Sequence, residues 1–245
     1  PLTLFKLTPD HRYAVIEMGM NHPGEIGYLS KLSRPNVALV NNVQRAHLGM
    51  FESVEGIAQA KGEIFQGLDF DGVAVINADD THAGLMRLLA SDRECLEFGL
   101  EKPAPIFARY ELREFSSHVE IIAPSGEAHV TLQQPGLHNV RNALAAATVG
   151  IALGVDLGSI ATGLNRMTAV KGRLVRKAGL SGALVIDDSC NANPDSVRAA
   201  IDVLAATKGA KILVFGDMGE IGEEGPQLHA EIGDTAKRAG IDALY

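Results

Sequence analysis

"NVALVNNV" (residues 36–43) is a run of aliphatic, partly β-branched residues that ends in polar turn residues, and "GVAVINA" (72–78) repeats the pattern. Between them, "SVEGIAQAKGEIFQGL" (53–68) has the apolar spacing of a helix, with Ser53 in the N-cap position. A strand, a helix and a second strand at this spacing predict an α/β fold with a mostly parallel sheet.

Three further segments extend this first domain. A short apolar run at 13–16 predicts a strand ahead of the others. Residues 106–132 have a different pattern, in which two alternating runs are joined by a Pro-Ser-Gly turn. This pattern predicts antiparallel strands that form a β-rich insertion beside the main sheet. "GLHNVRNALAAATVGIALG" (136–154) then predicts a long, alanine-rich helix.

Strand and helix patterns start afresh after residue 174, which predicts a second, Rossmann-like domain. We therefore expect one domain at 1–174 and an incomplete one at 175–245. Asp195 or Ser196 is the expected N-cap of its first helix. The expected elements are strands at 183–188 and 211–217 and helices at 195–206 and 225–240.

Composition excludes several classes of protein. The net charge of −8 and pI near 5.5 would repel a nucleic-acid backbone or an anionic membrane surface. The longest apolar stretch, 143–155, is shorter than the roughly 20 residues of a membrane span, so no membrane insertion is expected. Cys95 and Cys190 are far apart and match no zinc spacing, which favours a reducing cytoplasm.

Polar residues follow several predicted strands, where ligands collect in open parallel sheets. Glu17 follows the first, Asn41 and Asn42 the second, with His47 close behind, and Asp188 ends the first strand of the second domain. Each could be an ordinary polar strand end. Their placement on one rim favours a binding site.

Lys61 is the most informative residue, because Ile57, Ile64 and Leu68 place it on the apolar stripe of its helix. A buried ammonium must reach water along its stem, find an anion, or lose its charge. A neutral amine can react with carbon dioxide to give a carbamate. Such a carboxylate-like group would be useful beside a divalent cation, for which Glu17 supplies another oxygen.

Three other residues allow two interpretations each. Asn139 and Asn142 lie one helical turn apart, where their carboxamides could read a purine edge or could cap the helix and face water. Arg173 could clamp a phosphate at the domain junction or lie on the surface.

No G-x-x-x-x-G-K-[ST] loop occurs, so the usual triphosphate cradle is missing from this chain.

In order and spacing, seven motifs resemble the Mur ligases of peptidoglycan synthesis, and within them the branch that adds D-alanyl-D-alanine. The match spans nearly all of the chain, and the first and last motifs are specific to that branch. The motifs are "EMGMNHPGEI" (17–26), "NNVQRAHL" (41–48), "AKGEIFQGL" (60–68), "NADD" (77–80), "GLHNVRNALAA" (136–146), "KGRL" (171–174) and "DDSCNANPDSVRAAIDVL" (187–204).

The resemblance implies a central ATPase domain followed by a Rossmann-like domain, and it implies ATP and two Mg²⁺ ions as cofactors. It also implies that the chain begins after the P-loop and stops within the last domain. Cys190 departs from the family, which usually has tyrosine there. The implied roles are metal binding and catalysis for Glu17, His47 and Lys61, nucleotide binding for Asn139, Asn142, Arg173 and Asp188, and substrate binding for Asn191 and Asn193.

The implied reaction phosphorylates the terminal carboxylate of a UDP-N-acetylmuramoyl-tripeptide, after which the amine of D-alanyl-D-alanine attacks the acyl phosphate. We expect a cytoplasmic monomer whose two domains close about the linker near Arg173. Because the P-loop is missing, this chain alone should bind ATP weakly or not at all and should not turn over.

Two other functions stay open. A sister amide ligase, such as a D-glutamate, diaminopimelate or folylpolyglutamate ligase, would share Glu17, Lys61 and Asn139 but would lack the motif at 187–204. A non-catalytic binding module without a P-loop would share the fold alone.

Overall fold

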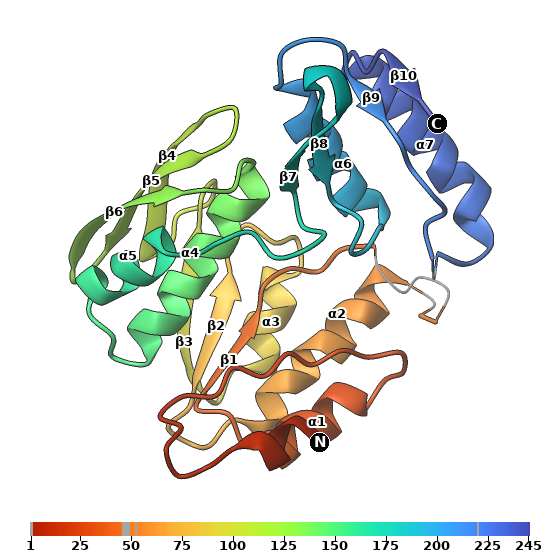
Figure 1. Ribbon diagram of the computed structural model, residues 1–245. Coiled ribbons are helices and arrows are strands. Elements are labelled where there is room, and N and C mark those ends of the chain that lie inside the picture. Colours follow the sequence, from red (N-terminus) through yellow and green to blue (C-terminus); the bar gives the residue numbers. More distant parts are fainter. Residues whose placement is uncertain (1, 46–49, 52, 220) are drawn as a thin grey trace.

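The computed structural model of the protein describes residues 2–45, 50–51, 53–219 and 221–245 (Figure 1). Its largest sheet has the strand order β1-β2-β3-β4-β5-β6, parallel from β1 to β4 and antiparallel from β4 to β6. The predicted β-rich segment is confirmed, and its strands continue the parallel sheet instead of standing beside it. The strands are β1 (Val37–Val40), β2 (Val73–Asn77), β3 (Glu94–Gly99), β4 (Ile106–Leu112), β5 (Ser117–Ala123) and β6 (Gly126–Leu132).

Helices cover both faces of this sheet, and β2 shows how the sequence divides them. Ala74 and Ile76 point into a core shared with α1, α2 and α3, whereas Val75 points into a core shared with α4 and α5. The helices of this first unit are η1 (Leu2–Lys6), α1 (Glu25–Ser33), α2 (Val54–Gly62), η2 (Glu63–Gly67), α3 (Ala83–Leu89), α4 (Leu137–Ala152) and α5 (Leu157–Asn165).

The predicted helix at 53–68 is confirmed, with Ser53 accepting a hydrogen bond from the amide of Gly56 at 3.1 Å. It tightens to a 3-10 turn, η2, after Gly62.

The strand predicted at 13–16 is wrong. These residues have no regular secondary structure, and Val15 is 96% exposed. A strand forms only where a neighbour supplies hydrogen bonds, and β1 pairs only with β2 in the described part of the sheet. The first side chains to reach the core come after this segment, where Met18 packs against the first core and Met20 is buried in it.

The second unit, from β7 to β10, lies on the side toward which β1 and β2 point (Figure 1). β7 and β8 form an antiparallel hairpin, while β9 and β10 pair in parallel. No helix of the described residues is long and apolar enough to cross a membrane. The elements of this unit are β7 (Val175–Ala178), η3 (Leu180–Gly182), β8 (Leu184–Asp187), α6 (Pro194–Ala205), β9 (Ile212–Leu213), η4 (Gly222–Glu224), α7 (Gly225–Arg238) and β10 (Ala243–Leu244).

The N-cap of α6 is Asn193, so the prediction of Asp195 or Ser196 is wrong. The Asn193 side chain accepts hydrogen bonds from the amides of both residues, at 3.1 and 2.9 Å. Pro194 explains the shift, because a residue without an N–H fits the first helical position and moves the cap one residue before it.

Carboxylate and glycine contacts fix the position of α2 and η2 against α1. The Glu63 carboxylate accepts hydrogen bonds from the amides of Gly24, at 2.8 and 2.9 Å, and Gly27, at 3.1 Å, at the start of α1. Gly67 lies directly against Ser30, whose hydroxyl donates to the carbonyl of Ile64. The helix that carries Lys61 is therefore held at its C-terminal end, next to Lys61.

Gly67→Ala should strongly destabilise the protein, by about 3 kcal/mol or more, because a Cβ there would overlap the backbone of Ser30. The matched control is Gly84→Ala in α3, where a Cβ meets nothing within 4 Å. That control should be neutral or stabilising by up to about 1 kcal/mol. Urea unfolding of both variants measures the difference, and equal midpoints would contradict the packing argument.

Candidate functional site

The loop that follows β1 is tied to two other elements at the carboxyl end of the sheet. The Asn41 side chain donates to Oδ1 of Asn142 in α4 at 2.8 Å, and the Asn41 carbonyl accepts from Nδ2 of Asn77 at 3.0 Å. The next carbonyl, of Asn42, accepts from Nζ of Lys61 at 2.8 Å. The structure thus brings Lys61 and Asn142, two predicted site residues, to one rim.

Lys61 lies half-buried on α2, whose residue Ile57 is fully buried, which confirms its predicted place on the apolar face. Its nitrogen meets a backbone carbonyl instead of extending into water. Burial lowers the pKa of the Lys61 amine, and the nearby Asp80 carboxylate opposes that shift. The Asp80 carboxylate itself accepts hydrogen bonds from the main-chain amides of Val43 and His82, both at 2.7 Å. The amine therefore gives up its proton more readily than an exposed lysine.

Of the three predicted metal ligands, the structure describes Glu17 and Lys61. Glu17 is exposed, and no hydrogen bond joins it to Lys61. His47 lies outside the described residues. Within those residues, no group of three or more His, Cys, Asp and Glu side chains is placed to hold a metal ion. A lysine ammonium repels a cation, so this donor set fits Mg²⁺ only when Lys61 carries a carbamate, because oxygen ligands are then available.

Asn139 and Asn142 have separate partners near the start of α4. The helix begins at Leu137, after Gly136 at φ 95°, and Asn139 Nδ2 donates to the carbonyl of Pro135 at 2.7 Å. Helix capping by Asn139 is therefore wrong as an alternative. Asn142 is exposed on the same rim and is held by Asn41.

His138 and Asp188 face one another across the two units, and sequence reasoning missed the histidine. Burial lowers the pKa of His138, while Asp188 and Asp202 oppose that shift. Burial raises the pKa of Asp188, although its carboxylate accepts from the amide of Leu174 at 3.1 Å. The available signal was the position of His138 in "GLHNVRNA", directly before a predicted site residue.

The remaining predicted residues come from the second unit and its approach. Arg173 is exposed, and its charge is among the weaker influences that lower the pKa of Asp188. Asn191 is exposed and accepts a hydrogen bond from the amide of Ala192. The side-chain oxygen of Asn193 caps α6, so within its side chain only the amide nitrogen Nδ2 remains for another contact.

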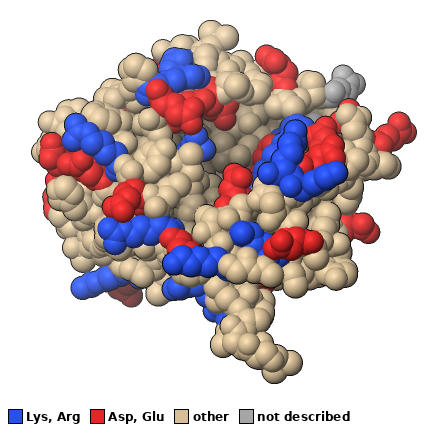
Figure 2. All heavy atoms as spheres, turned by 90° about the horizontal axis from the view of Figure 1, so that it is seen from above, with Lys and Arg blue, Asp and Glu red and all other residues tan. Residues whose placement is uncertain are grey.

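Figure 2 views the molecule from above, the side toward which β1 and β2 point, and shows a hollow near the centre with charges of both signs around it. A cavity of about 590 Å³ lies elsewhere, beside the β7–β8 hairpin. Residues 174–179 and 182–184 line most of it, and none of the predicted site residues does.

Comparisons with known proteins agree along the whole chain. Residues 1–150 match the Mur ligase middle domain, and residues 172–245 match the Mur ligase glutamate ligase domain. Over 246 aligned residues, 43% are identical to the UDP-N-acetylmuramoyl-tripeptide–D-alanyl-D-alanine ligase of Escherichia coli, covering 100% of this chain and 54% of that protein.

Solved structures give the same picture. A crystal structure of MurF from Acinetobacter baumannii has a TM-score of 0.95 and 38% identity, covering 99% of this chain and 53% of that one. The MurF ligase of Thermotoga maritima in complex with ADP has a TM-score of 0.80 and 28% identity, covering 92% and 51%. The chain thus spans about half the length of these relatives.

His138→Gln should flatten the dependence of stability on pH. Because the pKa of His138 is lowered in the folded state, the unfolded state binds more protons between that value and the ordinary 6.5. Wild-type stability should therefore fall as the pH drops from 6.5 through this window, and glutamine removes that contribution. Urea midpoints at several pH values measure the slope.

His129→Gln is the control for this experiment, since His129 is exposed on β6. Asp188 acts in the opposite direction, because its raised pKa makes the folded state bind more protons than the unfolded state above 3.8. Wild-type stability should therefore fall as the pH rises above 3.8, and Asp188→Asn should make this fall smaller. Identical slopes for His138→Gln and the wild type would rule out the histidine contribution.

Proposed function

This chain belongs to the Mur ligase family, and we propose that it serves the ATP-dependent joining of D-alanyl-D-alanine to a UDP-N-acetylmuramoyl-tripeptide in peptidoglycan precursor synthesis. The observation that carries the proposal is the similarity to ligases of that name along the entire chain. We propose domains at 1–174 and 175–245, with the ATP site at the rim between them.

The nucleotide site of the proposal combines both units. Asn139 and Asn142 would contact the adenine, Arg173 the phosphates and Asp188 the nucleotide from the second unit. Support comes from the hydrogen bond that holds Asn142 at the rim and from the relative that binds ADP. Asn191 and Asn193 would contact the substrate, and Asn193 would do so through its side-chain nitrogen Nδ2.

Lys61 would act as a carbamate. Its neutral amine attacks carbon dioxide, a C–N bond forms, and one proton is released to solvent. The product keeps one N–H, so the hydrogen bond to the Asn42 carbonyl can persist. Glu17, His47 and this carbamate would hold Mg²⁺, two ions in the proposed complex, which supplies positive charge against the phosphates of ATP.

The protein side chains would otherwise position the reactants. The terminal carboxylate of the tripeptide takes the γ-phosphoryl group of ATP, which releases ADP and gives an acyl phosphate. The amine of D-alanyl-D-alanine then attacks the acyl carbon, loses a proton and displaces phosphate. Asn41 and Asn77 hold the loop against which this chemistry would take place.

The amine donor tests the proposed substrate. In the protein at its natural length, ATP-dependent phosphate release with the tripeptide acceptor should require D-alanyl-D-alanine. D-Glutamate, diaminopimelate and L-glutamate should support less than about 1% of that rate. Release with one of these amines instead would identify a sister ligase, and release with none would favour a non-catalytic binding module.

Lys61→Met should lower the ligation rate by at least about 100-fold while leaving the protein folded. Stability should stay equal or rise slightly, because methionine fills the site without a buried charge. For the wild type, removing dissolved CO₂ should lower activity, and bicarbonate should restore it. Lys31→Met on the exposed side of α1 is the matched control and should behave as wild type; comparable activity in the two variants would refute the role of Lys61.

A further inference from the structure

The loop at residues 41–45, hereafter the strand-end loop, forms several hydrogen bonds within the first unit through its residues 41–43. Asn41 and Asn42 are held by Asn77 and Lys61, and the amide of Val43 donates to Asp80 at 2.7 Å. At the far end of the loop, another residue, Arg45, contacts the second unit. Among the described residues, it alone in the loop forms hydrogen bonds to that unit.

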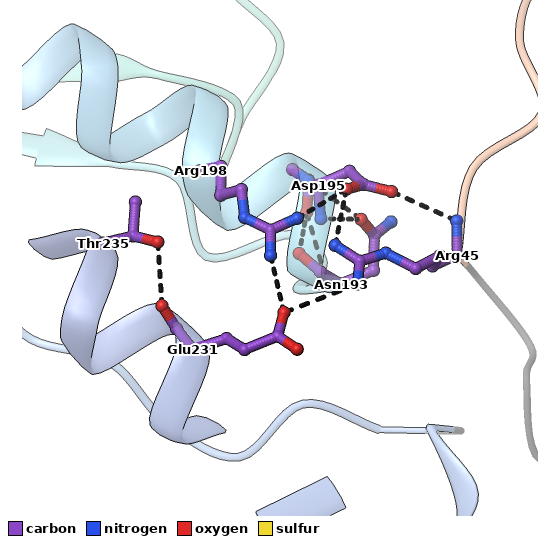
Figure 3. A network of polar contacts seen from close by, with 7 residues as sticks. Arg45, Asn193, Asp195, Arg198, Glu231 and Thr235 are labelled. Carbon is purple, nitrogen blue, oxygen red and sulfur yellow. Dashed lines mark hydrogen bonds and ion pairs between the residues drawn. The ribbon is translucent and has the colours of Figure 1, made fainter. Parts of the chain in front are cut away.

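Arg45 joins a network of four charged residues, which we call the latch: Arg45, Asp195, Arg198 and Glu231 (Figure 3). The Arg45 amide donates to Oδ2 of Asp195 at 3.1 Å, and its guanidinium lies 3.2 Å from Oδ1 of the same carboxylate. Arg198 contacts that Oδ1 at 3.0 Å and Oε2 of Glu231 at 2.8 Å. Nη1 of Arg45 closes the ring at 3.5 Å from Glu231.

The latch is better placed than an ordinary surface ion pair. Its side chains are only 25–36% exposed, and two positive charges alternate with two negative ones, so no net charge is desolvated. Asp195 lies in the first turn of α6, next to the Asn193 cap. Because α6 and α7 pack on each other through a common core, the partners of Arg45 are ordered before it binds them.

The contact joins residues that are far apart in the sequence. Arg45 and Asp195 are 150 residues apart, and Arg45 and Glu231 are 186 apart. Asp195 takes both the backbone amide and the side chain of Arg45, so the position of α6 constrains the main chain of the loop as well as its side chain. Two residues before Arg45, the same main chain donates to Asp80, which also acts on the charge of Lys61.

We propose that Arg45 is a positioning residue: through the latch, the second unit sets the conformation of the strand-end loop and so the position of the Asn42 carbonyl that receives Lys61. Separation of the two units would break the latch and release the loop. The arrangement makes the order of the Lys61 site depend on whether the second unit is docked.

The test is amide hydrogen exchange, followed by NMR, in wild type and Arg45→Met. Methionine keeps an aliphatic stem and removes the guanidinium. Val43 is the reporter, because its amide and Asp80 lie outside the latch. Exchange at Val43 should accelerate by about fivefold or more in the variant. At about 1 M salt, where the Debye length is about 3 Å, wild-type exchange should approach that of the variant.

Arg87→Met is the matched control, since Arg87 forms a two-pronged pair with Glu97, at 2.7 Å for both contacts, inside the first unit. It should leave Val43 unchanged. Faster exchange at the amide of Arg45 alone, with unchanged exchange at Val43, would overturn the proposal, because the latch would then not affect the rest of the strand-end loop. Equal acceleration in the control would overturn it too, as general destabilisation.

Glu231→Gln tests the same latch from α7 and serves if Arg45→Met does not fold. It should accelerate exchange at Val43 in the same direction, and unchanged exchange would count against the proposal. No nucleotide, metal or amine enters these measurements. Their outcome is therefore separate from that of the proposed ligase activity.

Discussion

The hydrogen bond from the Lys61 amine to the Asn42 carbonyl is the interaction on which the site depends. An amine removed from water needs an acceptor, and here the acceptor is a main-chain carbonyl in the loop that follows β1. That choice ties the chemistry of a side chain to the conformation of a loop. Any movement of the loop changes the solvation of the nitrogen, and with it the ease with which the amine loses its proton.

The surrounding structure fixes both ends of this hydrogen bond by different means. On the helix side, Gly67 packs directly against the backbone of Ser30, so a backbone contact sets how closely η2 and α2 approach α1. On the loop side, the holders are polar side chains, among them Asn77 and Asp80. A main-chain contact allows little adjustment, whereas side-chain amides and carboxylates can change partners. The loop is therefore the part of the site that can respond to the second unit.

Sequence reasoning succeeded where the physical signal is local. The spacing of apolar residues predicts α2, and the alanine-rich composition predicts α4. A charged residue on the apolar stripe of α2 marks Lys61 without any structure. It failed at 13–16, because an apolar run becomes a strand only with a partner, and pairing is not encoded locally. The cap of α6 was misplaced by two or three residues, although Pro194 carried the signal for Asn193.

The latch lay beyond prediction for another reason. Arg45 has no helical or strand periodicity around it, and its partners are over a hundred residues away. Four separate charged residues in an acidic chain read as ordinary surface positions until the fold brings them together.

Two contacts of different character join the units at the carboxyl end of the sheet. At the start of α4, His138 and Asp188 are half-buried, and Gly136 leaves room for Val203 of α6, so this contact depends on desolvation and protonation. At the strand-end loop, Arg45 meets Asp195 and Glu231, and this contact depends on ionic strength. Both contacts reach α6 or the strand before it, so α6 cannot move as a body without disturbing both. Among the described residues, these two contacts between the units are thus weakened by different solution conditions, one by protonation and the other by salt.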